Sequence, residues 1–189
     1  MTAVLPAPAR TDKVPPRGLV FTYALEEPVS LSQPTHRHLE RWVVTVTNGD
    51  RERTDSGITI GDAQVLIVNL EAGQDVRAFA DTASGEWREQ TEGGPGSSHV
   101  LVLERVWVDP AYRGHGLGPI IAATVVDRLG RGCHLAACYP APFAGDCRPE
   151  DREQEIEALG RIWAKVGFQP WRDGVWMLDL EERRTQPVP

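Results

Sequence analysis

The feature that most constrains this chain is a β-strand followed closely by a glycine-rich helix start. Residues 99–108 (His-Val-Leu-Val-Leu-Glu-Arg-Val-Trp-Val) are rich in β-branched residues, and Asp-Pro ends the run, as is typical of a strand. From residue 117 onward, apolar residues recur at helical spacing, with Pro119 in the first turn, where its missing N–H is no loss. Gly114, Gly116 and Gly118 occur where the two patterns meet. The sequence therefore predicts a strand, a short glycine-rich loop and a helix.

This loop has the properties of an anion site. Glycine lacks a Cβ atom, so backbone N–H groups can approach a ligand closely. The helix N-terminus adds unpaired donors and a partial positive charge, which favour phosphate or pyrophosphate, and Arg113 adds a fixed cation. The loop lacks the lysine of a P-loop, and five residues separate Val108 from Gly114, whereas a dinucleotide fingerprint directly follows its strand. Another phosphate-containing ligand is therefore favoured.

The pattern Val-x-Pro-x-x-Arg-Gly-x-Gly-x-Gly at residues 108–118 resembles the coenzyme A signature of the GNAT superfamily of acyltransferases. Residues 161–168 (Arg-Ile-Trp-Ala-Lys-Val-Gly-Phe) resemble a second GNAT motif, which ends in Tyr-Glu-Lys-Leu-Gly-Phe. In that family the strand before the loop splays and pairs its backbone with the pantetheine arm, while the loop amides hold the pyrophosphate. The resemblance implies acetyl-CoA, or another acyl-CoA, as the cofactor. It implies that the cofactor is bound by Val106, Trp107, Val108, Arg113, Gly114, His115, Gly116, Leu117, Gly118 and Trp163.

The remaining sequence predicts one domain built from further strands and helices. Alternation and turn signals predict strands at 18–26, 40–47, 58–60 with 63–70 (a pair or one bent strand), 132–139 and 175–180; helical spacing predicts helices at 75–87, 117–129 and 151–166. We expect a GNAT-like α/β (α+β) fold, with a mixed, mostly antiparallel central sheet flanked by helices and a β-α-β core that binds coenzyme A. Residues 18–182 are expected to form the domain, with tails at 1–17 and 183–189. The helix at 75–87 departs from the usual GNAT pattern, and its role is left open.

Composition narrows the classes of function. The chain has 189 residues, a net charge of −7 and a pI ≈ 5.2, which argues against nucleic acid as a partner, since its binders usually carry basic patches. The cysteines Cys133, Cys138 and Cys147 form no Cys-x-x-Cys pair. We therefore expect neither a metal site nor a disulfide framework, and a cytoplasmic location. No apolar run reaches the length of a membrane span.

Acetyl transfer from a thioester to an amine needs a base for the amine, donors for the oxyanion and an acid for the leaving thiolate. By simple alternation, Glu104 shares a strand face with Val106 and Val108. A carboxylate inside an apolar strand costs free energy unless it is paired or used. Glu104 is therefore interpreted either as the general base or as one partner of an ion pair at the rim.

The acid differs from that of the family. The family uses the tyrosine of its second motif, but this chain has Trp163 there, and an indole cannot donate a proton to a thiolate at useful pH. Tyr139, at the end of the neighbouring strand, or solvent is expected to take its place. Cys138 is either an acyl-carrying nucleophile or, as is commoner for cysteine, a core residue.

These residues predict an acyl-coenzyme A-dependent N-acetyltransferase in which an amine attacks the thioester directly. The alternative is an acyl-coenzyme A-binding protein without transfer activity, used for sensing or assembly; Trp163 in place of tyrosine keeps it open. A nucleotide-binding module is a third, weaker alternative. The expected partner is a small-molecule or peptide amine, with no nucleic acid and no membrane, and a homodimer is left open.

Overall fold

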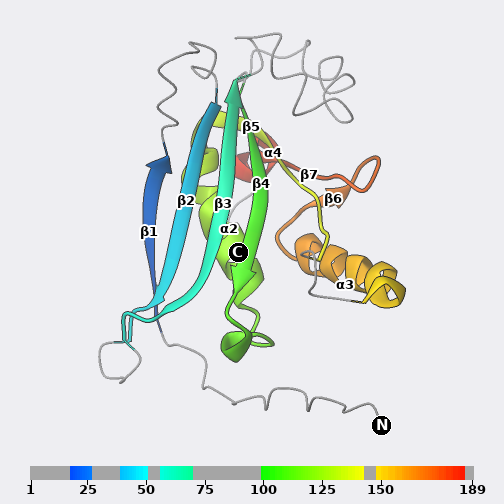
Figure 1. Ribbon diagram of the computed structural model, residues 1–189. Helices are drawn as coiled ribbons and strands as arrows, with labels where there is room; N and C mark the ends of the chain where they lie inside the picture. The colour runs from blue at the N-terminus through cyan, green and yellow to red at the C-terminus, as the bar shows by residue number, and fades with distance from the viewer. Residues whose placement is uncertain (1–17, 27–38, 51–55, 70–98, 143–147, 186–189) are drawn as a thin grey trace, which may run out of the picture.

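The computed structural model describes residues 18–26, 39–50, 56–69, 99–142 and 148–185. These residues form a seven-stranded sheet in the order β1-β2-β3-β4-β5-β7-β6, accompanied by three α-helices (Figure 1). The strands are β1 Leu19–Glu26, β2 Leu39–Asn48, β3 Thr59–Asn69, β4 His99–Val108, β5 Cys133–Cys138, β6 Gln169–Pro170 and β7 Trp176–Asp179. The helices are α2 Leu117–Leu129, α3 Arg152–Ala164 and α4 Leu180–Thr185. The expected tail at 1–17 and helix at 75–87 lie outside the described residues.

The sheet is antiparallel except between β4 and β5. β1 to β4 pair in chain order, each antiparallel to the next, and β7 is antiparallel to both β5 and β6. β4 and β5 are parallel, and α2 makes the crossover that such a pair requires. The predicted mixed, mostly antiparallel sheet with a β-α-β core is thus confirmed. Of the two alternatives for the region 58–70, the described residues show one strand, Thr59–Asn69, rather than a pair.

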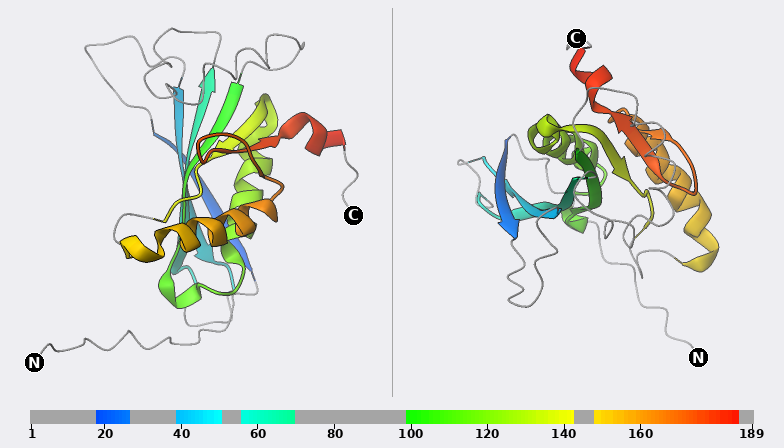
Figure 2. Two further views of the ribbon diagram at one scale, coloured as in Figure 1. Left: turned by 90° about the vertical axis from the view of Figure 1, so that its right-hand side faces the viewer. Right: turned by 90° about the horizontal axis from the view of Figure 1, so that it is seen from above.

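Helix α2 covers one face of the sheet, which we call the helix face. Its buried side chains share one stripe of the helix, as an amphipathic helix requires: Leu117, Ile121, Ala122, Val125 and Val126. They form one core with Val65 of β3 and with Leu101 and Leu103 of β4. Figure 2 shows α2 and α4 on this side of the sheet and α3 beside its far edge. We call the opposite side, which faces the viewer in Figure 1, the front face; strand alternation places Arg41, Asp62, Leu66, Val102 and Glu104 on it.

A β-bulge interrupts the alternation of β4. Val65 of β3 pairs with Leu103, but the preceding residue, Gln64, pairs with Arg105. Glu104 is therefore the extra residue on the bulged strand, without a paired residue of its own on β3.

The bulge changes which side chains face the core. Leu103, before it, and Val106 and Val108, after it, all pack in the core under α2. Glu104 instead lies on the same face as Val102, two residues earlier, which belongs to the small cluster on the front face. The expectation that Glu104 shares a face with Val106 and Val108 is therefore wrong, because the extra residue shifts the alternation by one.

The domain extends beyond the expected boundary at residue 182. Helix α4 runs to Thr185, and Arg183 forms an ion pair with Asp127 of α2, with 3.0 Å between Nη2 and Oδ1. The Arg184 guanidinium donates to the backbone carbonyls of Gly130, Arg131 and Cys133. These carbonyls lie where α2 ends and β5 begins, and a cation there satisfies acceptors that the helix leaves unpaired. Residues 183–185 thus belong to the fold.

Arg184→Met is expected to lower the free energy of unfolding by about 2 kcal/mol, because a hydrogen bond to a charged group contributes roughly 1.5–3 kcal/mol net. Urea unfolding followed by circular dichroism measures the change. Arg161→Met is the matched control, because its ion pair with Glu157 is largely exposed and such pairs contribute less than about 1 kcal/mol. Equal losses in the two variants would contradict a stabilising role for the Arg184 contacts.

Candidate functional site

The loop after β4 begins as a rigid turn. The Asp109 side chain accepts a hydrogen bond from the N–H of Ala111 at 2.8 Å, and its carbonyl accepts one from Tyr112 at 2.8 Å. Residues Pro110–Tyr112 form a short 3-10 helix, and the Tyr112 side chain is buried in the core. The Asp-Pro pair that ends the strand therefore also fixes the direction in which the chain leaves it.

The glycines give the second half of the loop its shape. Gly114 and Gly116 have φ angles of 84° and 73°, a region that residues with a side chain rarely adopt. Gly116 is the N-cap of α2, and glycine has no side chain with which to cap the helix. A Cβ atom added at Gly114, Gly116 or Gly118 would meet no atom within 4 Å. The N-terminus of α2 therefore faces open space in which an anion can approach the backbone.

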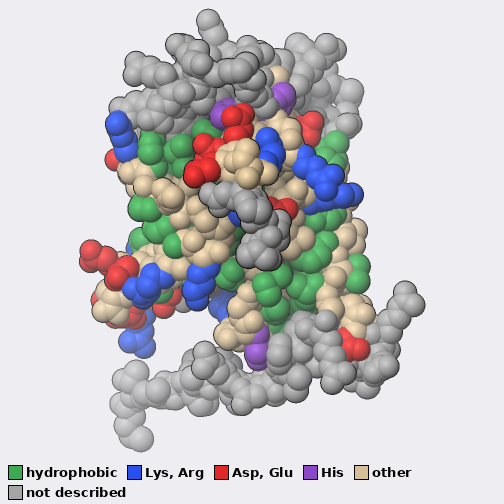
Figure 3. Space-filling view, turned by 180° about the vertical axis from the view of Figure 1, so that it is seen from behind, with side chains coloured by type: hydrophobic (Ala, Val, Ile, Leu, Met, Phe, Trp, Pro, Cys, Tyr) green, Lys and Arg blue, Asp and Glu red, His purple; other side chains and the backbone are tan. Residues whose placement is uncertain are grey.

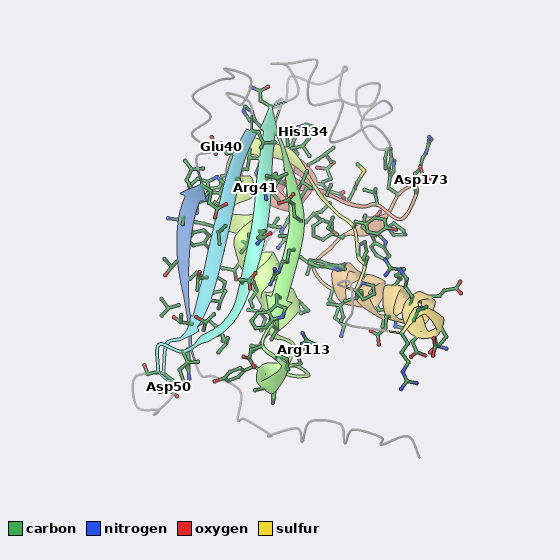
Figure 4. All side chains as sticks on the ribbon, in the orientation of Figure 1. Glu40, Arg41, Asp50, Arg113, His134 and Asp173 are labelled. Atoms are coloured by element: carbon green, nitrogen blue, oxygen red, sulfur yellow. The ribbon has the colours of Figure 1, made fainter. Side chains whose placement is uncertain are left out.

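Two side chains expected to bind cofactor brace this loop internally. Nε of Arg113 donates to the carbonyl of Val108 at 2.9 Å, and Nδ1 of His115 lies 3.1 Å from the carbonyl oxygen of Tyr112. Figure 4 shows Arg113 at the lower end of β4. The Leu117 side chain is buried in the core, so only its backbone can face a ligand at this site.

β4 and β5 separate before β4 ends. Their parallel pairing stops at Leu103 and Cys138, whereas β3 stays paired with β4 as far as Val108. Within the described residues, the backbone of Val106 to Val108 therefore has a strand partner on one side only. Figure 1 shows β4 continuing to the glycine loop while the chain after β5 turns toward α3. The resemblance to the GNAT superfamily implied such a separation of strands, with the pantetheine arm of the cofactor pairing with the freed backbone.

Glu104 is the first residue of β4 beyond the last pair with β5. Its Oε2 lies 3.1 Å from Nη1 of Arg41, and the two side chains keep 20% and 36% exposure. Burial raises the pKa of Glu104 above its usual range, and the Arg41 charge partly offsets this by lowering it. The ion pair that the sequence left as one of two interpretations is present, on a half-buried carboxylate beside the separating strands.

Arg41 was not among the residues expected from the sequence. It lies 63 positions from Glu104 in the chain, and the two side chains meet only because β3 pairs with both β2 and β4 in the observed registers. An arginine in a strand that alternates polar and apolar residues is ordinary for a solvated face, so no sequence signal distinguished it.

Tyr139 is the first residue beyond the last pair on the other side of the separation. Its ring packs on the turn before β7, where a Cβ added to Gly174 would lie 2.7 Å from Cε2 of Tyr139. The side chain is 58% exposed. The two residues expected to be catalytic therefore flank the separation, but Glu104 contacts Arg41 of β2 and Tyr139 contacts the turn between β6 and β7.

Trp163 holds the end of α3. Its carbonyl accepts from the N–H of Phe168 at 3.2 Å, while Gly167, at φ 107°, donates to Ala164; this pattern is a Schellman cap. The rings of Trp163 and Phe168 pack edge to face with centroids 5.7 Å apart, the apolar contact that accompanies such a cap. The resemblance gave Trp163 a cofactor contact, and the structure shows a packing residue beside the core.

The two described cysteines are core residues. Both are free and buried, and burial raises the pKa of Cys138 to about 12 and that of Cys133 to about 11. A thiol with such a pKa holds almost no thiolate at neutral pH. The core interpretation of Cys138 is therefore favoured over an acyl-carrying nucleophile.

The described part of the chain shows two further properties. None of its helices is long and apolar enough to cross a membrane, and no three of its His, Cys, Asp or Glu side chains gather as a metal site. Figure 3 shows acidic and basic side chains interspersed over the rear of the molecule.

The sequence profile of the acetyltransferase (GNAT) family matches residues 32–141 of the 189, more than half of the chain. The chain belongs to the GNAT acetyltransferase family. The match spans the separating strand, the glycine loop, α2 and β5, so the elements that form the candidate site of this GNAT protein are those of the family. No curated protein matches the sequence.

Solved structures also resemble this GNAT chain. Arabidopsis thaliana NAA60 in complex with acetyl-CoA is 13% identical, with 86% of this chain and 99% of that chain covered and a TM-score of 0.48. A mutant of the toxin AtaT, bound to the C-terminus of the antitoxin AtaR and acetyl-CoA, is 12% identical, with 88% and 99% covered and a TM-score of 0.44. A mutant of KacT is 10% identical, with 77% and 74% covered and a TM-score of 0.43. At these identities and TM-scores, the likeness concerns the fold alone.

Proposed function

We propose that this protein transfers an acetyl group from acetyl-coenzyme A to the amine of a small molecule or peptide by direct attack. One observation carries the proposal: the N-terminus of α2, opened by glycines, follows a strand whose end has left its parallel neighbour. A phosphate site and an extended backbone site are thereby continuous, as a long phosphorylated thioester requires. The family membership supports the same activity.

The residues present fit this cofactor. The space beside Gly114, Gly116 and Gly118 is open, so their N–H groups and that of Leu117 can hold a pyrophosphate. Val106 to Val108 offer backbone groups for the amide-containing pantetheine arm, and Arg113 keeps the junction of strand and loop in place through Val108. Acetyl-coenzyme A, when bound, supplies the thioester carbon that the amine attacks.

The catalytic roles follow from position and chemistry. Glu104 takes the proton of the amine, directly or through water, and its raised pKa suits a base that must work near neutral pH. A backbone N–H from Val106 to Val108 stabilises the oxyanion. Tyr139 or solvent protonates the thiolate, since Trp163 cannot. Because the thiolate of coenzyme A is a good leaving group, a dedicated acid is helpful rather than obligatory.

Two measurements test the proposal. Calorimetry with acetyl-coenzyme A, NAD and ATP should show binding of the first alone. Release of free coenzyme A thiol in the presence of a panel of small-molecule and peptide amines should then show amine-dependent turnover. Binding without turnover on any amine would favour the non-catalytic alternative, a sensor or assembly protein, for which the use of Trp163 in the α3 cap is the supporting observation.

Cys138→Ala is expected to leave kcat unchanged, because direct attack uses no acyl-enzyme and the buried thiol, with a pKa of about 12, holds almost no thiolate. The measurement is the steady-state rate on the most active amine of the panel. Loss of the small buried group should lower the unfolding temperature only modestly. A variant that folds but loses turnover, or an acetylated Cys138 in mass spectra of the wild type, would contradict direct attack.

A further inference from the structure

Two charged side chains meet on the front face where β4 and β5 separate. Arg41 pairs across the sheet with Leu66, and Leu66 pairs with Val102, so Arg41 lies in the same row as Val102. Glu104 is two residues farther along β4. The Arg41 side chain must therefore cross β3 diagonally to bring Nη1 to 3.1 Å from the Glu104 carboxylate. Figure 4 shows Arg41 at the front of the sheet, over its middle strands.

The surroundings of this pair make the contact matter. Leu66, which lies in the row between the two strands, is fully buried, and Glu104 itself is half-buried. In such a place the ionised carboxylate loses hydration and needs a compensating charge. Removing one partner of a half-buried pair therefore affects the other more than at an exposed surface pair.

Arg41 is the charge in position to do this. Among the described residues, the other charged side chains on this part of the front face are those of Asp62 of β3 and Arg105 of β4. They pair with each other, with 3.3 Å between Oδ1 of Asp62 and Nε of Arg105. Glu26 of β1, which pairs across the sheet with Arg41, is exposed. On the side of β5, the ring of Tyr139 packs on the turn before β7. Within the described part of the chain, desolvation and the Arg41 charge are accordingly the influences on the pKa of Glu104.

We propose that Arg41 is a positioning residue for acetyl transfer: its guanidinium holds the Glu104 carboxylate ionised and in place at the point where β4 leaves β5. The inference rests on the proposed function, in which Glu104 is the base. Arg41 itself acts through Glu104, and the glycine loop lies at the other end of the separated segment. Replacing Arg41 should therefore change the rate of acetyl transfer and leave the affinity for acetyl-coenzyme A unchanged.

The experiment uses the full chain with Arg41→Met, Arg41→Lys and the control Arg161→Met, whose exposed pair lies on α3. Three quantities are measured: the titration of the Glu104 carboxyl carbon by NMR, the pH profile of kcat/KM on the most active panel amine, and the affinity for acetyl-coenzyme A by calorimetry. Arg41→Met should raise the pKa of Glu104, because a nearby positive charge is lost. It should move the acid limb of the profile to higher pH and lower the plateau about tenfold, a part of what base catalysis contributes.

The expected pattern is that Arg41→Lys restores most of both effects, that the control changes neither, and that acetyl-coenzyme A affinity is constant throughout. A Glu104 titration that does not move in Arg41→Met overturns the proposal, whatever the rates show. A titration that moves while the acid limb and plateau stay unchanged also overturns it. Failure of the proposed function would be visible separately, as absence of turnover in the unmodified protein, and the NMR titration then still decides whether Arg41 holds Glu104 ionised.

Discussion

Gly116→Asp is expected to abolish coenzyme A binding while the fold is retained. Gly116 has φ 73°, which aspartate and asparagine tolerate better than other residues with a side chain, and a side chain there enters open space. It places a negative charge at the N-terminus of α2, where the pyrophosphate is expected. Two unit charges about 4 Å apart near a protein surface repel by roughly 4 kcal/mol, so Kd should rise by about 10²–10³-fold.

Two control variants make this result specific. Gly116→Asn has nearly the same shape without the charge, so it should weaken binding far less than aspartate does. Gly132→Asp places the same charge in open space beyond the other end of α2 and should leave affinity unchanged. Calorimetry with coenzyme A and thermal unfolding report affinity and fold, and the aspartate effect should shrink as salt screens the charges. Unchanged affinity in Gly116→Asp would move the anion site away from this loop.

Glu104→Gln is expected to lower kcat by roughly 10²–10⁴, the contribution of a general base, with the affinity for acetyl-coenzyme A unchanged. In the wild type, burial raises the pKa of Glu104, so kcat/KM should fall as pH decreases through a value above the usual carboxyl range. The variant should lack this acid limb, because glutamine does not titrate. Steady-state kinetics across pH on the most active panel amine provide the measurement.

Stability separates a catalytic loss from a structural one. A carboxyl whose pKa is raised by folding stabilises the fold below its unfolded pKa, and this contribution is lost as pH rises through the folded pKa. At neutral pH, Glu104→Gln should therefore leave the free energy of unfolding nearly unchanged. Asp62→Asn is the matched control, since Asp62 is also partly buried, pairs with an arginine and has a raised pKa. A loss of kcat in Asp62→Asn as large as that in Glu104→Gln would favour a structural role for both pairs.

Most of the sheet and the glycine loop were predictable from the sequence because their signals are local. The strand at 99–108 was predicted with the bounds observed for β4, from a run rich in β-branched residues that Asp-Pro ends. The start of α2 was predicted because Gly116, Leu117 and Pro119 mark a helix N-terminus without help from tertiary contacts. The C-cap at Gly167 was likewise predicted, since a left-handed residue there needs glycine.

The neighbourhood of Glu104 was not predictable in the same way. Strand alternation assigned it to the face of Val106 and Val108, but a bulge depends on how β3 pairs with β4, which no single strand's sequence specifies. The C-terminal end of the domain was not predicted at the right residue for a similar reason. Arg183 and Arg184 follow a short strand and look like a charged tail, yet Arg184 contacts carbonyls more than 50 positions earlier and Arg183 pairs with Asp127 of α2.

The family and the strand–loop–helix unit were set by sequence signals alone, and the anion site at the glycine loop was predicted from them, because glycine conformations, caps and apolar periodicity act within a few residues. Only the tertiary structure decided which face Glu104 lies on, that Arg41 is its partner, that Trp163 packs against Phe168 and that β4 leaves β5 after Leu103. Each of these depends on register between segments distant in the chain. Register is set by packing across the whole core, so it cannot be inferred from the residue pattern of one segment.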